Sequence, residues 1–294
     1  MPIIRSANEE DLLQMQNVFY QNEIREVQAL PPPSSDVSLT LLHILQTGNL
    51  YVAEQDNQIL AYAGTITRDT ITFLTDLFVH PEIQSTGLGK MLLQRAMPPD
   101  GLIHCTMSSS DPRAQALYIR AGMQPQFPNF NLHWGDSSHK KLPNSSLEVV
   151  EAESITPELT QWDRQASGRE RPLDHTFWVG PEQGRPLWFL RQGTPIGYGY
   201  VRLNVGTLLH SKICKVGPIG VKSADDATDC VLAAINWASK RAKLLHIDVP
   251  GHHPSLAPLL DCGFRILYAD IFLSSATIPF FDTHRYIPSG SDLL

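Results

Sequence analysis

Cysteine and charge are both scarce in this sequence of 294 residues. Its four cysteines include no C-x-x-C pair, so neither a zinc site nor a disulfide framework is indicated. We therefore expect reduced, mostly buried thiols, no metal site and a cytoplasmic protein. Charged residues make up 18% of the chain, too few for a disordered or coiled-coil protein, whereas an apolar share of 42% suffices for packed cores. The composition predicts a soluble globular protein.

An excess of basic residues and a long apolar run are also missing. The 23 Lys and Arg against 30 Asp and Glu give a formal charge of −7, which does not suit a phosphate backbone or an anionic membrane surface. No 18 consecutive residues are apolar, as a spanning helix would require. Glu9, Glu10 and Asp11 interrupt the first segment, where a secretory signal would have a basic head and an apolar core. We expect neither nucleic acid nor membrane as a partner.

The chain resembles itself. Its length predicts two domains or one large one. A strand followed by a capped acidic helix start occurs around Ala7 and again around Ala152, 145 positions later. A hairpin pattern in residues 50–64 returns in residues 187–200, and Gly122 is matched by Gly263. Nearly constant offsets indicate an internal duplication, although two generic α/β segments could share such patterns.

Each half has the order strand, helix, helix, hairpin, strand, helix, strand, helix, strand. This order predicts an α/β fold with a mixed sheet, and a ligand site where a strand gives way to a helix. Residues 137–146 are polar and rich in turn formers, which favours a linker. We predict a first domain over residues 1–136 and a second over residues 147–294.

The strongest chemical pattern lies between residues 71 and 93. A β-rich apolar run ends near Pro81, a loop containing Gly87 and Gly89 follows, and an apolar helix starts near Leu88. Such a turn directs several backbone N–H groups at one point, where the helix dipole favours negative charge. The glycines let an anion approach the backbone, and Gln84 can donate a further hydrogen bond. The loop predicts a phosphate-bearing ligand, yet it matches neither a P-loop nor a dinucleotide fingerprint.

Two motifs in the first half resemble those of the GCN5-related N-acetyltransferases (GNAT). Val79-His80-Pro81 followed by Gln84-x-x-Gly87-x-Gly89 is similar to their acetyl-coenzyme A (acetyl-CoA) loop, Q/R-x-x-G-x-G/A. Residues 110–123 are similar to their N-x-x-A-x-x-L-Y-x-x-x-G-F helix, with Asp111 in place of asparagine and Met123 in place of phenylalanine. The resemblance implies two tandem GNAT folds with acetyl-CoA as cosubstrate. It implies these coenzyme-binding residues: Leu77, Phe78, Val79, Gln84, Ser85, Thr86, Gly87, Leu88, Gly89, Lys90, Asp111, Ala114 and Tyr118.

The resemblance also implies direct transfer, in which a deprotonated primary amine attacks the thioester in a ternary complex. A backbone N–H near Val79 would stabilise the oxyanion. Tyr118 matches the family's acid for the leaving thiolate, with ring packing as the alternative role. The base acts through water in many members, and Asp76 is the candidate here, with fixation of a strand bulge as the alternative. Glu23 and Glu26 are further candidates for the base.

A covalent mechanism is the rival within enzyme chemistry. Cys105 and Ser108 to Ser110 lie close together in the sequence, but no G-x-S-x-G elbow frames them, so we expect direct transfer. A second rival is a protein that binds acyl-CoA as a sensor without turnover. Neither the acceptor nor the oligomeric state is defined by the sequence.

The second half lacks the coenzyme motif. When the strand ends of the two halves are aligned, Asp226, Asp229 and Val231 fall at the positions of the motif's glutamine and two glycines. Carboxylates would repel a diphosphate there. Leu259 stands at the position of Tyr118. We therefore expect a degenerate second domain and one active site per chain, in the first half.

Two groups of polar residues in the second half call for an interpretation. Residues 169–178, with Arg185 nearby, combine charges and aromatics, and could bind a substrate, contact the first half, or form a capped helix start with solvated charges. His252 and His253 are expected to lie in a loop, because no other ligand is spaced to complete a metal site.

Overall fold

The computed structural model describes residues 2–24, 35–99, 101–135, 142, 145–207 and 212–294. Most of the predicted linker 137–146, and Glu26, lie outside these residues. The chain forms two compact units, Met1–Thr106 with Gly206–Ser211, and Met107–Val205 with Lys212–Leu294. The end of the first sequence repeat thus belongs to the second unit.

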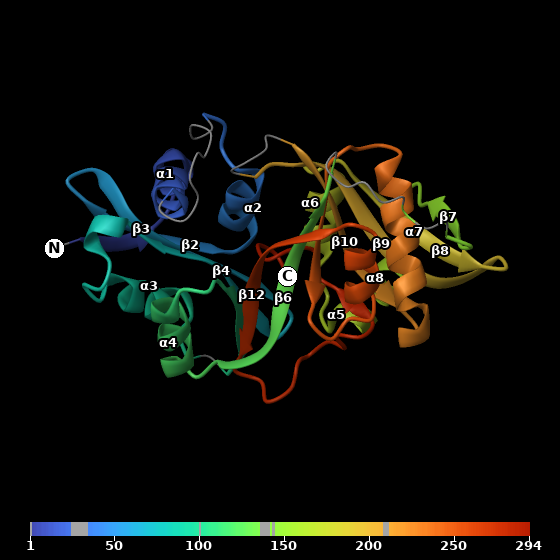
Figure 1. The fold of residues 1–294 in the computed structure, drawn as a ribbon. Coiled ribbons are helices and arrows are strands. Elements are labelled where there is room, and N and C mark those ends of the chain that lie inside the picture. The colour runs from blue at the N-terminus through green and yellow to red at the C-terminus, as the bar shows by residue number, and fades with distance from the viewer. Residues whose placement is uncertain (1, 25–34, 100, 136–141, 143–144, 208–211) are drawn as a thin grey trace. The chain divides into compact units, whose positions relative to one another are not determined.

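In the part of the first unit that the structure describes, five strands form a sheet and three α-helices accompany it. Its strands run in the order β1-β2-β3-β4-β5, antiparallel up to β4, while β4 and β5 are parallel. Figure 1 shows these elements in blue and green tones. They are β1 (Ile3–Ser6), α1 (Leu12–Glu23), α2 (Leu39–Thr47), β2 (Asn49–Gln55), β3 (Gln58–Arg68), β4 (Ile71–Val79), α3 (Leu88–Ala96) and β5 (Ile103–Ser108), whose last two residues belong to the second unit.

The predicted cap at Asn8 is confirmed. Its side chain accepts a hydrogen bond from the Glu10 N–H (2.9 Å), and the Asp11 carboxylate accepts one from the Asn8 N–H (2.9 Å), which completes a capping box. The turn is 3₁₀ before α1 starts at Leu12. Arg5 pairs with Asp11 at 2.7 Å and holds the pKa of that carboxyl below its usual range. The contact therefore ties the start of α1 to β1.

Within the described residues, the second unit has eight strands and its own helices. Its strands run in the order β12-β6-β11-β10-β9-β8-β7, and β13 pairs with β10. Its elements are α4 (Pro112–Arg120), β6 (Gln124–Trp134), β7 (Glu148–Glu151), α5 (Pro157–Ser167), α6 (Pro172–Val179), β8 (Gly184–Arg191), β9 (Thr194–Val205), β10 (Ile213–Val221), α7 (Ala227–Ser239), β11 (Leu245–Pro250), α8 (Leu256–Asp261), β12 (Arg265–Ser274) and β13 (Tyr286–Ile287).

Strand β6 comes from the first repeat but lies between two strands of the second. It pairs antiparallel with β11 from Leu245↔Trp134 onward, and antiparallel with β12 on its other side. A side-chain hydrogen bond supports the first pairing, because Asn131 Nδ2 donates to Asp248 Oδ1 at 3.0 Å. The sheet of the second unit therefore contains one strand that the repeat order assigns to the first half.

The strand registers confirm that the two halves are copies of one mixed α/β fold. In the first, Gly64 pairs with Asp76 and Thr65 with Leu74, which leaves a β-bulge at Thr75. In the second, β10 has one extra residue relative to β9 between Val216 and Ile219. Both bulges come about four residues before the valine that ends the strand. Two unrelated segments have no reason to share this irregularity.

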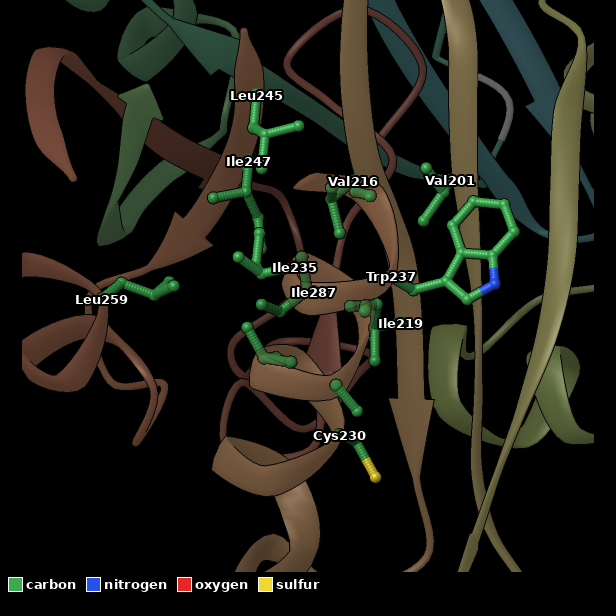
Figure 2. Packing of buried hydrophobic residues seen from close by; sticks show 14 of the residues in the cluster. Val201, Val216, Ile219, Cys230, Ile235, Trp237, Leu245, Ile247, Leu259 and Ile287 are labelled. Carbon is green, nitrogen blue, oxygen red and sulfur yellow. The ribbon is translucent and has the colours of Figure 1, made fainter. Parts of the chain in front are cut away.

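The core of the second unit forms where α7 covers the sheet. Figure 2 shows Val201, Val216 and Ile219 from the strands facing Ile235 of α7, all at most 1% exposed. Cys230 packs in the same cluster, and all four cysteines are buried thiols, as expected. Burial raises the pKa of the Cys214 thiol to about 12, so this thiol stays protonated. No helix in the described ranges is long and apolar enough to cross a membrane.

Candidate functional site

The end of β4 directs its last backbone groups away from β3. The His80 N–H donates to Leu60 O at 2.7 Å, and Val79 is paired with Ala61, which makes Val79 a non-hydrogen-bonded position of the ladder. Its N–H and C=O therefore point to the side opposite β3. On that side the β5 ladder runs from Ile71 to Leu74, where the Thr106 hydroxyl donates to Leu74 O (3.0 Å). Strand β4 thus ends with a backbone N–H directed away from its antiparallel neighbour.

Two side-chain amides hold the Val79 carbonyl. Asn22 Nδ2 donates to Val79 O at 3.2 Å, and Gln84 Nε2 donates to the same oxygen at 3.3 Å. Gln84 Nε2 also donates to Asn22 Oδ1 at 2.8 Å, so α1, the strand end and the loop are joined. We expected Gln84 to donate to an anion, and these contacts give its amide a positioning role. Asn22 was not identified from the sequence, because a single asparagine near a helix end has no distinguishing pattern.

The loop after β4 presents bare backbone at the start of α3. Ser85 and Gly87 adopt positive φ angles of 66° and 91°, and Gly87 caps α3 with no side-chain hydrogen bond. Thr86 Oγ donates to Ile83 O at 2.9 Å, which closes the turn. The first N–H groups of a helix have no partner within the helix, and its dipole is positive at this end. The predicted glycine-bearing loop is therefore present at the end of a strand and the start of a helix, a geometry that suits an anion.

A buried phenol and a carboxylate face each other beside the bulge of β4. The Tyr62 hydroxyl lies 3.5 Å from Asp76 Oδ1, and Tyr62 is 1% exposed. Burial, followed by the charges of Asp76 and Glu23, raises the pKa of Tyr62 well above 10. A Cβ on Gly64 would lie 2.7 Å from Thr75 Oγ1, so glycine is needed opposite the bulge. Asp76 can thus act as a base or support the bulge, and Glu23 lies on the same side.

Two further aromatic rings pack beside Tyr62 in the first unit. Phe19 of α1 meets Phe78 of β4 edge to face, with ring centroids 4.9 Å apart, and Phe78 stacks on Tyr62 at 5.5 Å. Such pairs add to the packing of α1 on the strands. The carboxylates of Asp76 and Glu23 therefore lie beside an apolar, aromatic surface.

The second predicted motif lies on α4, in the second unit. Asp111 caps this helix, since its Oδ1 accepts from the Arg113 N–H at 2.8 Å, so aspartate serves as a cap where the motif has asparagine. The Arg113 guanidinium also bonds Asp111 and lowers the pKa of that carboxyl. Ala114 is half-buried and Tyr118 is 6% exposed. The loop of residues 84–90 belongs to the first unit, whereas α4 belongs to the second.

At the equivalent loop of the second half, an arginine side chain pairs with the two carboxylates. Arg191 bonds both Asp226 and Asp229, the latter at 2.8 Å. Val231 is fully buried in α7, and Leu259, at the position of Tyr118, is fully buried in α8. Carboxylates paired with an internal cation leave no positive field for a diphosphate.

Arg169, Arg171 and Asp174 are buried, so our interpretation of the charges in residues 169–178 as solvated is wrong for these three and holds only for the exposed Glu170. Arg171 bonds both carboxylate oxygens of Asp163, at 2.8 and 2.7 Å, and both residues are at most 1% exposed. Arg169 and Arg171 each donate to Leu294 O, at 2.5 and 2.7 Å. Burial alone would raise the pKa of Asp163, but the Arg171 charge holds it far below its usual range. The exposed Arg185 pairs with Glu151 instead.

The paired histidines lie in the loop between β11 and α8. His253 is buried next to Ser255, with Nδ1 2.8 Å from its hydroxyl, and burial lowers the pKa of His253 to about 3. Across the parts of the chain that the structure describes, no group of three or more His, Cys, Asp or Glu is placed to hold a metal ion.

Comparisons with known proteins identify the class. Residues 46–124 match the family model of the acetyltransferase (GNAT) domain. The chain is similar in fold to a putative acetyltransferase from Pyrococcus horikoshii, with a TM-score of 0.77 and 16% identity, over 99% of this chain and 95% of that one. No curated protein matches the sequence.

Two further solved structures share the fold. A tandem GNAT protein from the clavulanic acid biosynthesis pathway, solved without acetyl-CoA, has a TM-score of 0.64 and 14% identity, over 95% of this chain and all of that one. A GCN5-related N-acetyltransferase from Sphaerobacter thermophilus has a TM-score of 0.62 and 13% identity, over 93% and 95%. The chain thus contains a GNAT acetyltransferase domain and has the fold of a tandem GNAT protein. Family and fold support acyl transfer as the general class of reaction.

Proposed function

We propose that the chain transfers an acetyl group from acetyl-CoA to a primary amine of a small molecule or peptide, using the first repeat. The observation that carries the proposal is the loop before α3, where Gly87 leaves the helix start as bare backbone directly after the end of β4. The residues there fit a diphosphate, because the start of α3 offers backbone N–H groups and residues 84–90 contain no acidic side chain. The equivalent loop of the second repeat has Asp226 and Asp229 and does not fit.

The proposed coenzyme contacts follow the two motifs. The backbone from Gln84 to Lys90 would bind the diphosphate, and the strand end from Leu77 through Phe78 to Val79 would hold the thioester arm. Asp111, Ala114 and Tyr118 on α4 would contact the coenzyme near its sulfur. When bound, acetyl-CoA supplies an activated acyl group and a thiolate leaving group. No metal is part of this proposal.

Three groups of the chain would carry the chemistry. Asp76 would remove a proton from the acceptor ammonium through a water molecule, so that the neutral amine can attack. The Val79 N–H, directed away from β3, would stabilise the charge that develops on the carbonyl oxygen. Tyr118 would donate a proton to the leaving thiolate, since a phenol is protonated at neutral pH. The amine forms the new C–N bond as the C–S bond breaks.

A second candidate function is supported by the burial of Tyr118. A tyrosine that is 6% exposed can serve as packing only, and the chain would then bind acyl-CoA as a sensor without turnover. For either candidate function, we still propose a cytoplasmic protein that has neither nucleic acid nor membrane as a partner.

Thiol release from acetyl-CoA across a panel of amines distinguishes the two. The acetyltransferase should release thiol in proportion to acetylated amine with at least one acceptor. Tight coenzyme binding, with thiol release never above the rate of hydrolysis for any amine, would identify the sensor. Absence of coenzyme binding would contradict both.

A further inference from the structure

In both repeats, the strand before the glycine loop or its equivalent continues beyond its parallel neighbour. In the second repeat, the ladder of β10 with β11 ends at Val216, although β10 continues to Val221. In the first, the ladder of β4 with β5 ends at Leu74, and β4 continues to Val79. The edge of the strand end on the side of the parallel neighbour is therefore left without that neighbour at matching positions of the two repeats.

Residues 285–287, which we call the closing segment, pair with this edge in the second repeat. They run antiparallel to β10, with Tyr286 opposite Gly220 and Ile287 opposite Ile219. In the part of the first unit that the structure describes, the strands beside β4 are β3 and β5, and no third strand pairs with it. Further backbone therefore covers the strand end in the second repeat and has no counterpart strand in the first.

The valine that ends each strand directs its N–H to the same side. The Lys222 N–H donates to Ile196 O at 3.1 Å, the contact that the residue after Val79 makes in the first repeat. The Val221 N–H therefore points away from β9, as the Val79 N–H points away from β3. The Val221 N–H donates to Arg285 O at 3.1 Å. The backbone donor that we propose for the oxyanion in the first repeat is thus already bonded, in the second, to a carbonyl of the chain itself.

The closing segment is buried and held by its side chains. Tyr286 and Ile287 are both 0% exposed, and Figure 2 shows Ile287 in the same core cluster as Ile219 of β10. The Tyr286 hydroxyl accepts a hydrogen bond from the buried Arg171 at 2.5 Å. Burial of two large side chains and a bond to a charged group both stabilise the segment in this position.

The closing segment and the arm of coenzyme A share the chemistry that a strand edge recognises. An extended chain with amide groups can add to the edge of a sheet through main-chain hydrogen bonds. The closing segment does this with its peptide groups, and the arm of coenzyme A also carries amide groups. Both would use the same backbone groups at the strand end, so the presence of one excludes the other.

We propose that the closing segment takes, in the second repeat, the place that the thioester arm of the coenzyme takes in the first. The chain's own backbone then closes the second repeat to acyl-CoA, in addition to the carboxylates of Asp226 and Asp229. The inference rests on the proposed function, because that proposal assigns the arm to the end of β4. It implies that a second repeat with a restored glycine loop still binds no coenzyme.

Amide hydrogen exchange of the full chain, followed by NMR, tests the proposal at the two valines. Val221 and Val79 are the same residue type at the same strand position, so each serves as the control for the other. Without ligand, the Val221 N–H should exchange more slowly than the Val79 N–H by about a hundredfold or more. Coenzyme A should slow the exchange of Val79 and leave that of Val221 unchanged.

A loop variant of the full chain tests the implied result. Gly87→Asp removes the first site, and Asp226→Gln with Asp229→Gly gives the second repeat the glutamine and the first glycine of the motif. Calorimetric titration should show no binding of coenzyme A to this triple variant. Without Gly87→Asp, the other two substitutions should leave one coenzyme A bound per chain, which serves as the control for folding.

Three results would overturn the inference and leave the proposed function intact. They are exchange of Val221 as fast as that of Val79 in the free chain, exchange of Val221 that coenzyme A slows, and binding of coenzyme A to the triple variant. Exchange of Val79 that coenzyme A does not slow would contradict the proposed arm site itself, and the inference with it. The two failures are therefore distinguished by which valine departs from the expected result.

Discussion

At the scale of single residues, we expect Gly87 to determine whether the first repeat can accept a diphosphate. Its φ of 91° and its open surroundings combine a left-handed backbone with free space for an anion. Gly87→Asp copies the second repeat and should abolish coenzyme binding, through charge repulsion and through backbone strain of about 1–2 kcal/mol.

Calorimetric titration with coenzyme A measures this effect. The control is Gly193→Asp, at a hairpin turn with φ of 76° and similarly open space. It imposes comparable strain and the same charge in the second unit, and coenzyme affinity should stay unchanged. Equal affinity in the Gly87 variant would contradict the site assignment.

A substitution of Tyr118 can distinguish a role as general acid from a role in packing. Tyr118→Phe keeps the ring and removes the proton, so coenzyme affinity should persist while kcat falls by about 10². Steady-state kinetics with the active amine, beside a binding titration, measures both quantities. Tyr51→Phe on β2 is the control and should leave kcat unchanged. A Tyr118 variant with full kcat would show that the residue serves packing alone.

At the scale of elements, the contact between Asn22 and Gln84 joins α1 to the end of β4. Asn22→Ala removes a donor to Val79 O and the acceptor for Gln84, so the strand end should lose its fixed orientation. We expect kcat to fall more than coenzyme affinity, with a stability loss of about 1 kcal/mol. Kinetics and urea unfolding test this together. Unchanged kcat in a stable variant would remove the positioning role.

The buried pair of Arg171 and Asp163 supports the elements of the second repeat. Arg171→Met leaves a buried carboxylate without its partner and should cost about 3–5 kcal/mol in urea unfolding. The exposed Arg185→Met is the control and should hardly move the midpoint. Because the folded-state pKa of Asp163 lies below its unfolded value of about 4, its stabilisation is present at neutral pH and is lost as pH falls below about 4. A pH series lacking this loss would argue against the pairing.

At the scale of the whole molecule, the repeats of the sequence and the compact units of the structure divide the chain differently. A fragment of residues 1–136 contains β6 without β11 and β12, its two antiparallel neighbours. We expect this fragment to be poorly folded, because both edges of β6 would be unpaired. Circular dichroism and limited proteolysis of the fragment, compared with the full chain, measure this. A stable fragment with cooperative unfolding would show that β6 is dispensable for the first repeat.

Sequence patterns predicted the features that depend on neighbouring residues. The duplication, the mixed α/β order, the cap at Asn8 and the loop around Gly87 all follow from local composition and spacing. The place of β6 could not be predicted, because strand pairing across more than 100 residues leaves no local pattern. The buried Arg171 was also missed, since charged residues are seldom fully buried and a run of them indicates solvent. Asn22 acts through a contact with Gln84, 62 positions away.

The position of β6 also bears on how the chain acquires its structure during synthesis. The hydrogen bond between Asn131 and Asp248 spans 117 positions, so β6 emerges from the ribosome long before β11 or β12 exists. Until then its apolar residues stay exposed, and contacts this distant in sequence form slowly. Completion of the second sheet therefore depends on the last fifth of the chain, and interrupted synthesis would leave an aggregation-prone intermediate.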